Sequence, residues 1–477
     1  MKVGFSQKNF TPPSRVTLAG LQRVRIVEEI ESEVYVNTFA MQKDGEQLII
    51  ASMDLVGFDK HFADLVKENI KSADIDKEKI ILCVTHTHSA PGVTFYNPDS
   101  FMKYVGEGKT LAEPALPEDV WDNNKNCEYI APIVAASIDE AWASKKDGYI
   151  SPAFGRAAIG HSRRLVYADG SSLMYGHSDR TDFLYPESGE DSGVEMLYVF
   201  DGEKKPMGVL VNVACPAQVM EATSKMSSDF WGKVRDRAHE KYGEDFTVVG
   251  LCGAAGCQSP RDLVRHKRAD ALKFDDPRKL PRRGDAYMYD VPGIIAIGKR
   301  LFHVIEDEME EAASRMADDQ ILKYETFKVE LPLGCVKEAD YREAKANLEK
   351  YVSETEVLDD RFKITRYTNI LKRYDRQREA AYMTANVHIV RLGDIAIATN
   401  PFELYLDYGL QIKGRSFAAQ TFLIQLACKD GAEGYLSTPA AEGGGSYGVG
   451  VLSCLTTPEG GRMLVNKTVA EINKMFS

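Results

Sequence analysis

The sequence predicts an α/β protein in which mixed sheets and flanking helices form a layered sandwich. Two observations support this fold class. Short apolar runs of strand length alternate along the chain with amphipathic segments of helical length. The same order of elements, a hairpin, a helix and a further strand, also occurs three times. No Pro-, Gly- or Ser-rich linker divides the chain, so we expect a single domain over residues 1–477.

Each of the three repeated units places polar residues at the ends of its strands. The units cover about residues 36–88, 196–260 and 387–435, and each contains one helix between its last two strands. Ligands in α/β folds gather beyond strand ends, so these residues are the candidates for a site. In chain order they are Asp54, His86, His88, Cys215, Cys257, Ser259, Glu403 and Tyr435.

A charged region at about 262–385 separates the second unit from the third. Residues 294–316, 341–352 and 367–382 each carry apolar residues on one face and charge on the other, which predicts helices. We therefore expect a helical insertion here. The basic residues at 261–283 are interrupted by acids and predict a solvated loop or a lid.

Composition restricts the partners of the protein. The formal net charge is −12, which argues against a nucleic-acid partner and against attraction to an anionic membrane surface. No apolar run approaches the roughly 20 residues of a membrane-spanning helix, and the first residues lack a secretory signal. Eight single cysteines without a Cys-x-x-Cys motif are typical of a reducing cytoplasm. We expect a cytoplasmic protein with a small-molecule substrate. The oligomeric state stays open, a homo-oligomer included.

The strongest motif is the histidine pair in Thr85-His86-Thr87-His88, which follows the apolar run 80–84. Residues i and i+2 of a strand share one face, so both imidazoles should project together from the strand end. Such a pair can hold a metal, or hold a metal and move a proton beside it. The alternative is two surface histidines on a loop.

Carboxylates at other strand ends are candidates to complete this site. Glu403 follows Asn400-Pro401-Phe402 at a strand end and is the best candidate ligand, although a glutamate favoured by a helix N-terminus is equally consistent with the pattern. Asp54 occupies the matching place in the first unit, where it would orient a histidine or cap a helix.

Several further residues are candidates for contact with a substrate. Tyr435 precedes a Gly-rich stretch at 443–450 and Tyr447 lies within it, which predicts either a flap that carries a tyrosine or a plain loop. Arg163 lies in a paired-arginine loop, where it would fork onto a substrate oxygen or be solvated. Cys257 and Ser259 lack a Gly-x-Ser-x-Gly context, so a structural turn is favoured over a nucleophile.

Together these motifs resemble the catalytic domain of the neutral/alkaline ceramidase family. The resemblance is carried by residues 9–13 and 18–20, by residues 52–57, above all by the segment 85–92, and by residues 256–260 and 434–439. It implies a zinc amidohydrolase. It implies that His86, Glu403 and Tyr435 are zinc ligands, that His88 moves a proton or stabilises an oxyanion, and that Tyr447 and Arg163 contact the reacting group.

The sequence departs from the family pattern at two chemically important places. The family's second zinc histidine has no counterpart, because Pro216 stands there and cannot coordinate through its side chain. An acid is also missing from the Gly256–Pro260 element. His86, Glu403 and Tyr435 would still give the three ligands of a catalytic zinc, with His88 or Cys215 as a fourth.

These departures leave three functional hypotheses. The first is a metal-assisted hydrolase that cleaves an amide bond of a soluble amide or sugar derivative rather than membrane ceramide. The second is a metal-free glycosidase, lyase or ester hydrolase on the same scaffold, with His88 and Glu403 as an acid–base pair. The third is a non-catalytic binding protein, which Pro216 suggests.

Overall fold

Two β-sheets pack face to face at the centre of the computed structural model. The structure describes residues 1–21, 23–94, 103–105, 110–111, 116–264, 290–354, 357–358, 361–429 and 433–477. Most of the basic stretch at 261–283 and the segment 430–432 therefore lie outside the described residues.

The larger sheet has eight strands in the order β17-β15-β14-β9-β1-β4-β5-β6. Neighbouring strands are antiparallel except at the two edges, where β5 and β6, and β15 and β17, run parallel. From edge to edge the strands are β17 (Thr247–Cys252), β15 (Pro206–Val213), β14 (Gly193–Asp201), β9 (Lys146–Arg156), β1 (Lys2–Asn9), β4 (Tyr35–Lys43), β5 (Glu46–Met53) and β6 (Ile80–Val84).

The smaller sheet has four strands in the order β19-β21-β22-β24, namely Leu322–Pro332, Tyr382–Leu392, Ile395–Thr399 and Gln420–Ile424. Apolar side chains from both sheets interlock in one buried cluster, which includes Phe39, Leu197, Leu251, Val390 and Phe422. Asn212 adds a polar link, because its side chain exchanges two hydrogen bonds of 2.9 and 3.0 Å with the backbone of Leu423.

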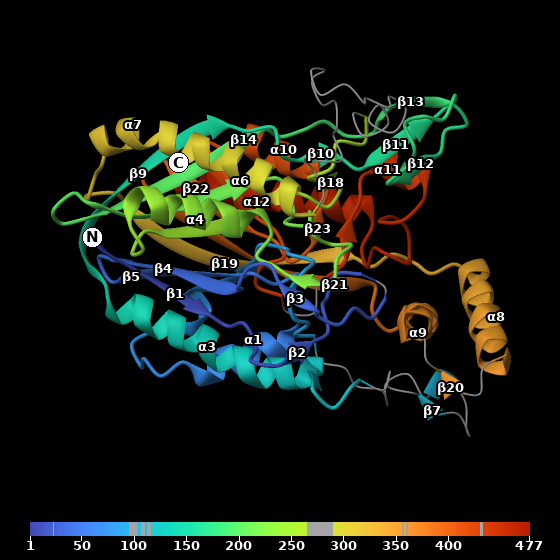
Figure 1. Ribbon diagram of the computed structural model, residues 1–477. Helices are drawn as coiled ribbons and strands as arrows, with labels where there is room; N and C mark the ends of the chain where they lie inside the picture. Colours follow the sequence, from blue (N-terminus) through green and yellow to red (C-terminus); the bar gives the residue numbers. More distant parts are fainter. Residues whose placement is uncertain are drawn as a thin grey trace, which may run out of the picture.

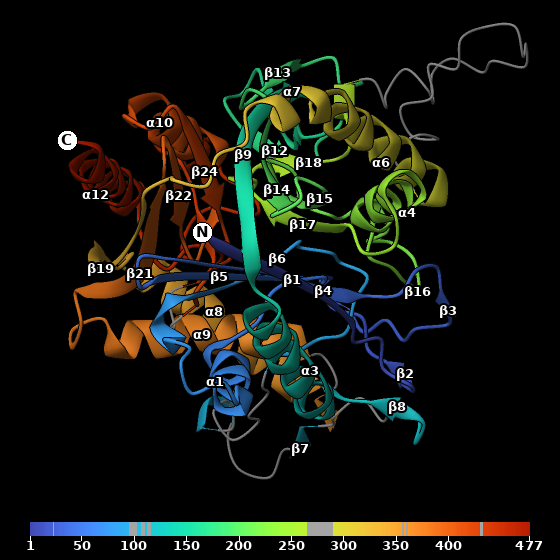
Figure 2. The same cartoon turned by 90° about the vertical axis from the view of Figure 1, so that its left-hand side faces the viewer.

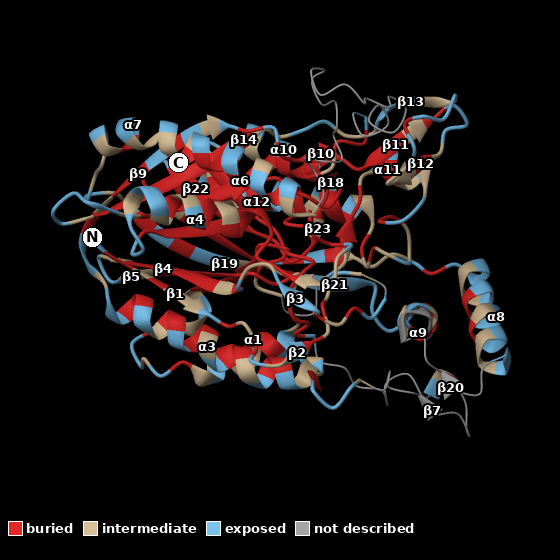
Figure 3. Ribbon diagram, viewed as in Figure 1, coloured by how far each residue is buried: buried red, intermediate tan, exposed pale blue. Residues whose placement is uncertain are grey.

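Helices cover the outer faces of both sheets. Three groups lie on three sides of the strands, as Figure 2 shows: α1 (Lys60–Asn69) with α3 (Asn123–Ala143), α4 (Phe230–Tyr242) with α6 (Asp290–Asp307), and α10 (Leu406–Arg415) with α12 (Pro458–Phe476). The inward faces of these helices are buried and their outward faces are exposed, as their amphipathic sequences require (Figure 3). The structure is therefore the layered α/β sandwich that the sequence predicts.

The predicted threefold repeat of elements is confirmed. Each unit has an antiparallel hairpin, a helix, and a last strand parallel to the second strand of the hairpin. The units are β4-β5-α1-β6, β14-β15-α4-β17 and β21-β22-α10-β24. In all three, the polar residues predicted at strand ends follow the last residue of a strand, so the fold brings them to one side of the sheets.

The remaining elements complete that side of the molecule. Both termini lie at the opposite end, while α8 (Glu338–Glu354), α9 (Arg361–Arg376) and α11 (Pro439–Gly444) lie near the strand ends (Figure 1). Short strands form the other small sheets: β12-β11-β13 (172–174, 164–167, 183–186), β10-β18 (161–162, 258–259), β23-β25 (403–404, 435–436), β16-β3 (225–226, 29–30), β2-β8 (15–16, 120–121) and β20-β7 (357–358, 110–111).

The prediction of a helical insertion at about 262–385 is wrong for residues 322–332. They form β19, which pairs along its whole length with β21 in the smaller sheet. The strand alternates buried and exposed positions, and this pattern of period two was missed between its charged helical neighbours. The helix predicted at 294–316 is two helices, α6 and α7 (Met309–Ser314). Among the described residues, no helix has the length and apolar character needed to cross a bilayer.

Candidate functional site

The two threonines of the Thr85–His88 segment fix its conformation. Thr85 donates a 3.2 Å hydrogen bond to Asp54, and Thr87 donates to the Ser227 carbonyl at 2.9 Å. Asp54 is fully buried and pairs with Arg235 at 2.6 Å. This carboxylate, which was expected to orient a histidine or cap a helix, instead holds Thr85, the residue before His86. Removing one partner of such a buried pair costs about 3–5 kcal/mol.

The histidines face each other across a turn rather than along a strand. β6 ends at Val84, and His86 has a positive φ of 63°. The two Nε2 atoms lie 3.3 Å apart, with the rings nearly perpendicular. His86 Nδ1 donates to the Val56 carbonyl at 2.5 Å, which leaves His86 Nε2 as an acceptor. The two imidazoles therefore project together, as predicted, but a left-handed turn at His86 and not a strand gives them this direction.

Glu403 and Tyr435 are brought together by two short strands. They are direct partners in the parallel pair β23-β25, so their side chains emerge side by side. Gly256 lies against this pair so closely that a Cβ there would be 2.4 Å from the Glu403 carbonyl oxygen. The strand residues of the third unit are thus packed directly on the loop that follows β17.

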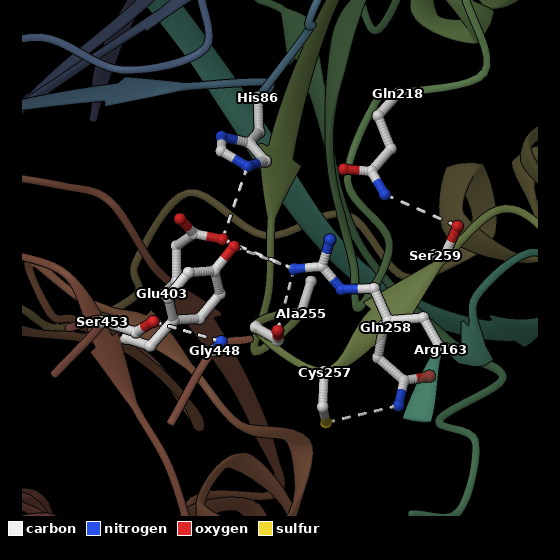
Figure 4. A network of polar contacts seen from close by, with 12 residues as sticks. His86, Arg163, Gln218, Ala255, Cys257, Gln258, Ser259, Glu403, Gly448 and Ser453 are labelled. Atoms are coloured by element: carbon white, nitrogen blue, oxygen red, sulfur yellow. Dashed lines mark hydrogen bonds and ion pairs between the residues drawn. The ribbon is translucent and has the colours of Figure 1, made fainter. Parts of the chain in front are cut away.

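One carboxylate oxygen of Glu403 faces two nitrogens from distant parts of the chain. Glu403 Oε2 lies 3.7 Å from His86 Nε2 and 3.6 Å from Arg163 Nη2, as Figure 4 shows. Arg163 also donates to the Gly256 carbonyl at 2.9 Å and to the Tyr435 hydroxyl at 3.2 Å. Glu403 therefore lies beside His86 of the histidine pair, as expected.

Two tyrosines, one buried and one half exposed, extend this network to the surface of a cavity. Tyr435 accepts from Arg163 and donates to the Tyr447 hydroxyl at 3.4 Å. Tyr447 is about half exposed, at 50%. The loop that carries it is fixed by the buried guanidinium of Arg164, which donates to the carbonyls of Tyr447, Ala441 and Gly445.

Burial sets the charges of these groups. It lowers the pKa of His86, which the Glu403 carboxylate raises only in part, and it lowers the pKa of His88 further because His86 and nearby arginines add to the effect. Burial also opposes the charge on Arg163, but Tyr435, Tyr175 and Glu403 raise its pKa by more, so it stays protonated. Burial raises the pKa of Tyr435 well above its usual value. The resting site therefore holds neutral imidazoles, a neutral phenol and a fixed guanidinium.

The other predicted site residues lie outside the wall of the cavity. Cys215 is buried and donates to the Ile159 carbonyl at 3.2 Å, and burial keeps it a thiol by raising its pKa. Cys257 accepts from the Leu406 amide, and Ser259 accepts from the Gln218 side chain at 3.5 Å. These contacts are structural, and any role of these side chains in chemistry stays a prediction.

The sequence analysis missed four residues of the site, namely Tyr175, Gln218, Glu221 and Arg261. Tyr175 accepts hydrogen bonds from Arg163 at 3.4 Å and from Gln218 at 2.5 Å. Glu221 lies 3.5 Å from His88 Nδ1 and pairs with Arg261 at 2.9 Å. All four come from loops without a motif, so spacing alone gave no signal for them.

The residues present fit a catalytic zinc only in part. Two ligands of a tetrahedral zinc lie roughly 3.3–3.5 Å apart, close to the 3.7 Å between His86 and Glu403. The Tyr435 hydroxyl, however, faces Arg163, whose fixed charge disfavours a dication beside it. Among the described residues, no group of three or more His, Cys, Asp or Glu side chains could hold a metal ion. Catalytic zinc normally has three protein ligands, so the described set falls short of the requirement.

The site opens into a large cavity of about 1680 Å³. We call the part of its wall that holds His88, Arg163, Glu403, Tyr435 and Tyr447 the inner wall, and the part formed by α9 and by residues 449–455 the outer wall. Typical small-molecule sites have about 300–1000 Å³, so this cavity has room for a substrate that reaches well beyond the reacting bond.

Comparison with solved structures shows the same fold in two ceramidase structures. A neutral ceramidase from Pseudomonas aeruginosa superposes with a TM-score of 0.64 and 16% sequence identity, covering 99% of this chain and 74% of that one. A ceramidase complexed with C2 gives a TM-score of 0.63 and 15% identity, covering 99% of this chain and 75% of that one. No protein-family model and no curated protein sequence matches the chain.

Proposed function

We propose that the protein is a hydrolase that cleaves the amide (C–N) bond of a soluble small molecule. The observation that carries this proposal is the single Glu403 oxygen that faces both His86 and Arg163, at 3.7 and 3.6 Å, on the inner wall of a cavity. The two ceramidase structures with this fold support the same reaction class, which the sequence motifs also suggest. Because the zinc ligands are incomplete, every step below uses only the chain's own groups.

Glu403 is the general base of the proposed reaction. A water about 2.8 Å from both Glu403 Oε2 and His86 Nε2 completes a triangle on the observed 3.7 Å separation. Glu403 takes one proton from this water as the oxygen attacks the carbonyl carbon. Arg163 keeps the carboxylate in place without closing the side that faces the cavity.

Tyr447 stabilises the carbonyl oxygen as negative charge develops on it. Arg163 donates to Tyr435 and Tyr435 donates to Tyr447, so the hydroxyl hydrogen of Tyr447 is left for a ligand. Each bond in this chain polarises the next. A donor of this kind contributes about 10²–10³ in kcat when it is aimed at an oxyanion.

His88 delivers the proton that the leaving nitrogen needs. The proton taken by Glu403 reaches His88 through His86, whose Nε2 lies 3.7 Å from Glu403 and 3.3 Å from His88 Nε2. When the C–N bond breaks, its electron pair goes to nitrogen, which takes the proton from His88. One water is consumed, and a carboxylic acid and an amine are released.

The test is release of primary amine from a panel of soluble N-acyl amides. We expect Glu403→Gln and His88→Ala to lower kcat by about a hundredfold or more, because each removes a proton-transfer step. Glu325→Gln is the matched control, since Glu325 is exposed on β19. Hydrolysis that is unchanged in Glu403→Gln would contradict the proposal. Binding of amides with no turnover would also contradict it. If the protein releases alcohol from esters but leaves amides intact, its reaction is ester hydrolysis and not amide hydrolysis.

A further inference from the structure

The outer wall of the cavity is a face of α9 that carries positive charge. Residues 365–367, 369–370, 372–373, 376–377 and 380 line the cavity, so one broad side of α9 and of the segment after it faces the cavity. Arg366, Lys372, Arg373 and Arg376 lie on this side. In a chain with a net charge of −12, this concentration of cations is local.

The basic residues of this wall divide into two kinds. Arg373 is structural, because it donates to the carbonyls of Gly334, at 3.1 Å, and of Val451. Arg366 and Arg376 are exposed and form no ion pair with any carboxylate among the described residues. Lys429, from the loop after β24, lines the same cavity and forms no ion pair with a carboxylate that the structure describes. Three cationic groups thus face the cavity without a counter-charge from the described chain.

The carboxylates of the cavity do not neutralise this charge. Glu403 pairs with Arg163, and Glu221 pairs with Arg261. The third lining carboxylate, Glu433, forms no ion pair with Arg366, Arg376 or Lys429 in the part of the chain that the structure describes. Burial lowers the pKa of Lys372, and repulsion from the charge of Arg376 adds to this effect. An anionic ligand would relieve this repulsion.

We infer that the substrate carries an anionic group, a carboxylate, sulfonate or phosphate, which the positive charge of Arg366, Arg376 and Lys429 on the cavity wall attracts. This inference rests on the proposed amide hydrolysis and names the class of its substrate. Guanidinium forks match the geometry of these anions. Apolar side chains such as Leu21, Leu333, Leu426 and Val449 also line the cavity and suit the apolar body of the same molecule.

A substrate series of equal acyl length tests the inference. N-Hexanoylglycine, N-hexanoyltaurine and N-hexanoyl-O-phosphoethanolamine carry the three anions, N-hexanoylethanolamine is neutral, and N-hexanoylputrescine is cationic. N-Butylsuccinamic acid places the anion on the acyl side. We expect kcat/KM to be at least tenfold higher for an anionic amide than for the neutral one, and lowest for the cationic one. Raising the salt concentration should reduce this ratio.

Variants connect the preference to the helix. Arg366→Gln and Arg376→Gln should each reduce the anionic preference about tenfold while turnover of N-hexanoylethanolamine stays unchanged. Arg378→Gln is the matched control, because Arg378 is exposed two residues further on and does not line the cavity. Equal rates for anionic and neutral amides, or a preference that survives both variants, would overturn the inference.

A binding measurement separates this inference from the proposed function. Titration calorimetry with hexane-1-sulfonate and hexan-1-ol compares a charged and a neutral head group on one apolar chain and needs no hydrolysis. Tighter binding of the sulfonate that is lost in Arg366→Gln, in a protein that hydrolyses no amide, would leave the anion site standing and remove the proposed reaction. Hydrolysis of amides in a protein that binds the sulfonate no more tightly than the alcohol would support the proposed reaction and overturn the anion site.

Discussion

The guanidinium of Arg163 and the carboxylate of Glu403 lie 3.6 Å apart, although 240 positions separate them in the chain (403 − 163). Arg163 lies between the short strands β10 and β11, and Glu403 begins β23. The pair exists because two small two-stranded sheets dock on each other beyond the ends of the main strands. Its position depends on Gly256, whose carbonyl accepts from Arg163 and whose missing side chain admits Glu403.

Arg163→Lys should lower kcat about a hundredfold on any amide that the wild-type protein hydrolyses. The ammonium keeps the charge but cannot contact Glu403, Tyr435 and the Gly256 carbonyl together, because it lacks the planar fork. Steady-state kinetics measure the effect, and circular dichroism checks the fold. Arg180→Lys, in the exposed pair with Asp182, is the control. A loss smaller than threefold would contradict a role of the guanidinium in the reaction.

Gly20→Ala should displace His88. Gly20 has a φ of +99°, and a Cβ there would lie 2.5 Å from Cγ of the His88 ring. The ring cannot yield without breaking its 3.3 Å approach to His86. We expect at least a tenfold loss of kcat in a protein that still folds.

Gly45→Ala is the matched control for backbone strain. Gly45 has a φ of +82°, but nothing lies within 4 Å of an added Cβ. Both variants should lose about 1–2 kcal/mol of stability from the left-handed conformation, and only Gly20→Ala should lose activity. Equal activities of the two variants would show that the contact with His88 is unimportant.

Part of the site follows from the sequence because α/β strand ends converge. His86 and Glu403 each follow an apolar strand of a repeated unit, and such ends meet on one side of the sheets. The 3.7 Å contact between them also depends on how the two sheets pack, because β6 belongs to the larger sheet and β22 to the smaller one. The fold class and the three units follow from the same hydrophobic patterns.

The other site residues and strands come together through contacts that leave no local pattern in the sequence. Glu221 and Tyr175 reach the site from loops, and the pairing of β10 with β18 joins residues about a hundred positions apart. β19 was missed because its alternation lies between charged helices, so the periodicity of its neighbours dominated the reading of the region. The positive φ of His86 depends on the bonds of Thr85 and Thr87 to distant residues.

The zinc content of the purified protein distinguishes the incomplete ligand set in the structure from the zinc site that the family resemblance implies. We expect protein purified without a histidine tag to hold well under one equivalent of zinc, because Pro216 supplies no ligand and Arg163 lies beside Glu403 and Tyr435. Elemental analysis after dialysis measures this, with zinc added back and activity followed. About one equivalent that is lost in His86→Ala would overturn the expectation and establish the zinc site that the resemblance implies.

His388 should make stability depend on pH between about 6.5 and 4. It is buried, and its Nδ1 lies within hydrogen-bond distance of the Tyr324 hydroxyl, at 2.8 Å. Burial, with a smaller contribution from Lys67, lowers the pKa of His388 to about 4. As the pH falls below 6.5, the unfolded chain takes up a proton at this position while the folded protein does not. The stability that neutral His388 contributes is therefore fully present above pH 6.5 and is lost as the pH falls through 4, at no more than about 1.4 kcal/mol per pH unit.

Urea unfolding of the wild-type protein and of His388→Gln at pH 7 and pH 5 measures this dependence. Glutamine can still accept from Tyr324 but does not titrate, so the difference in unfolding free energy between the two proteins should shift in favour of the variant at pH 5. His177→Gln is the control, because His177 is 82% exposed in its side chain. A difference between wild type and His388→Gln that is the same at both pH values would show that His388 titrates alike in the folded and unfolded states.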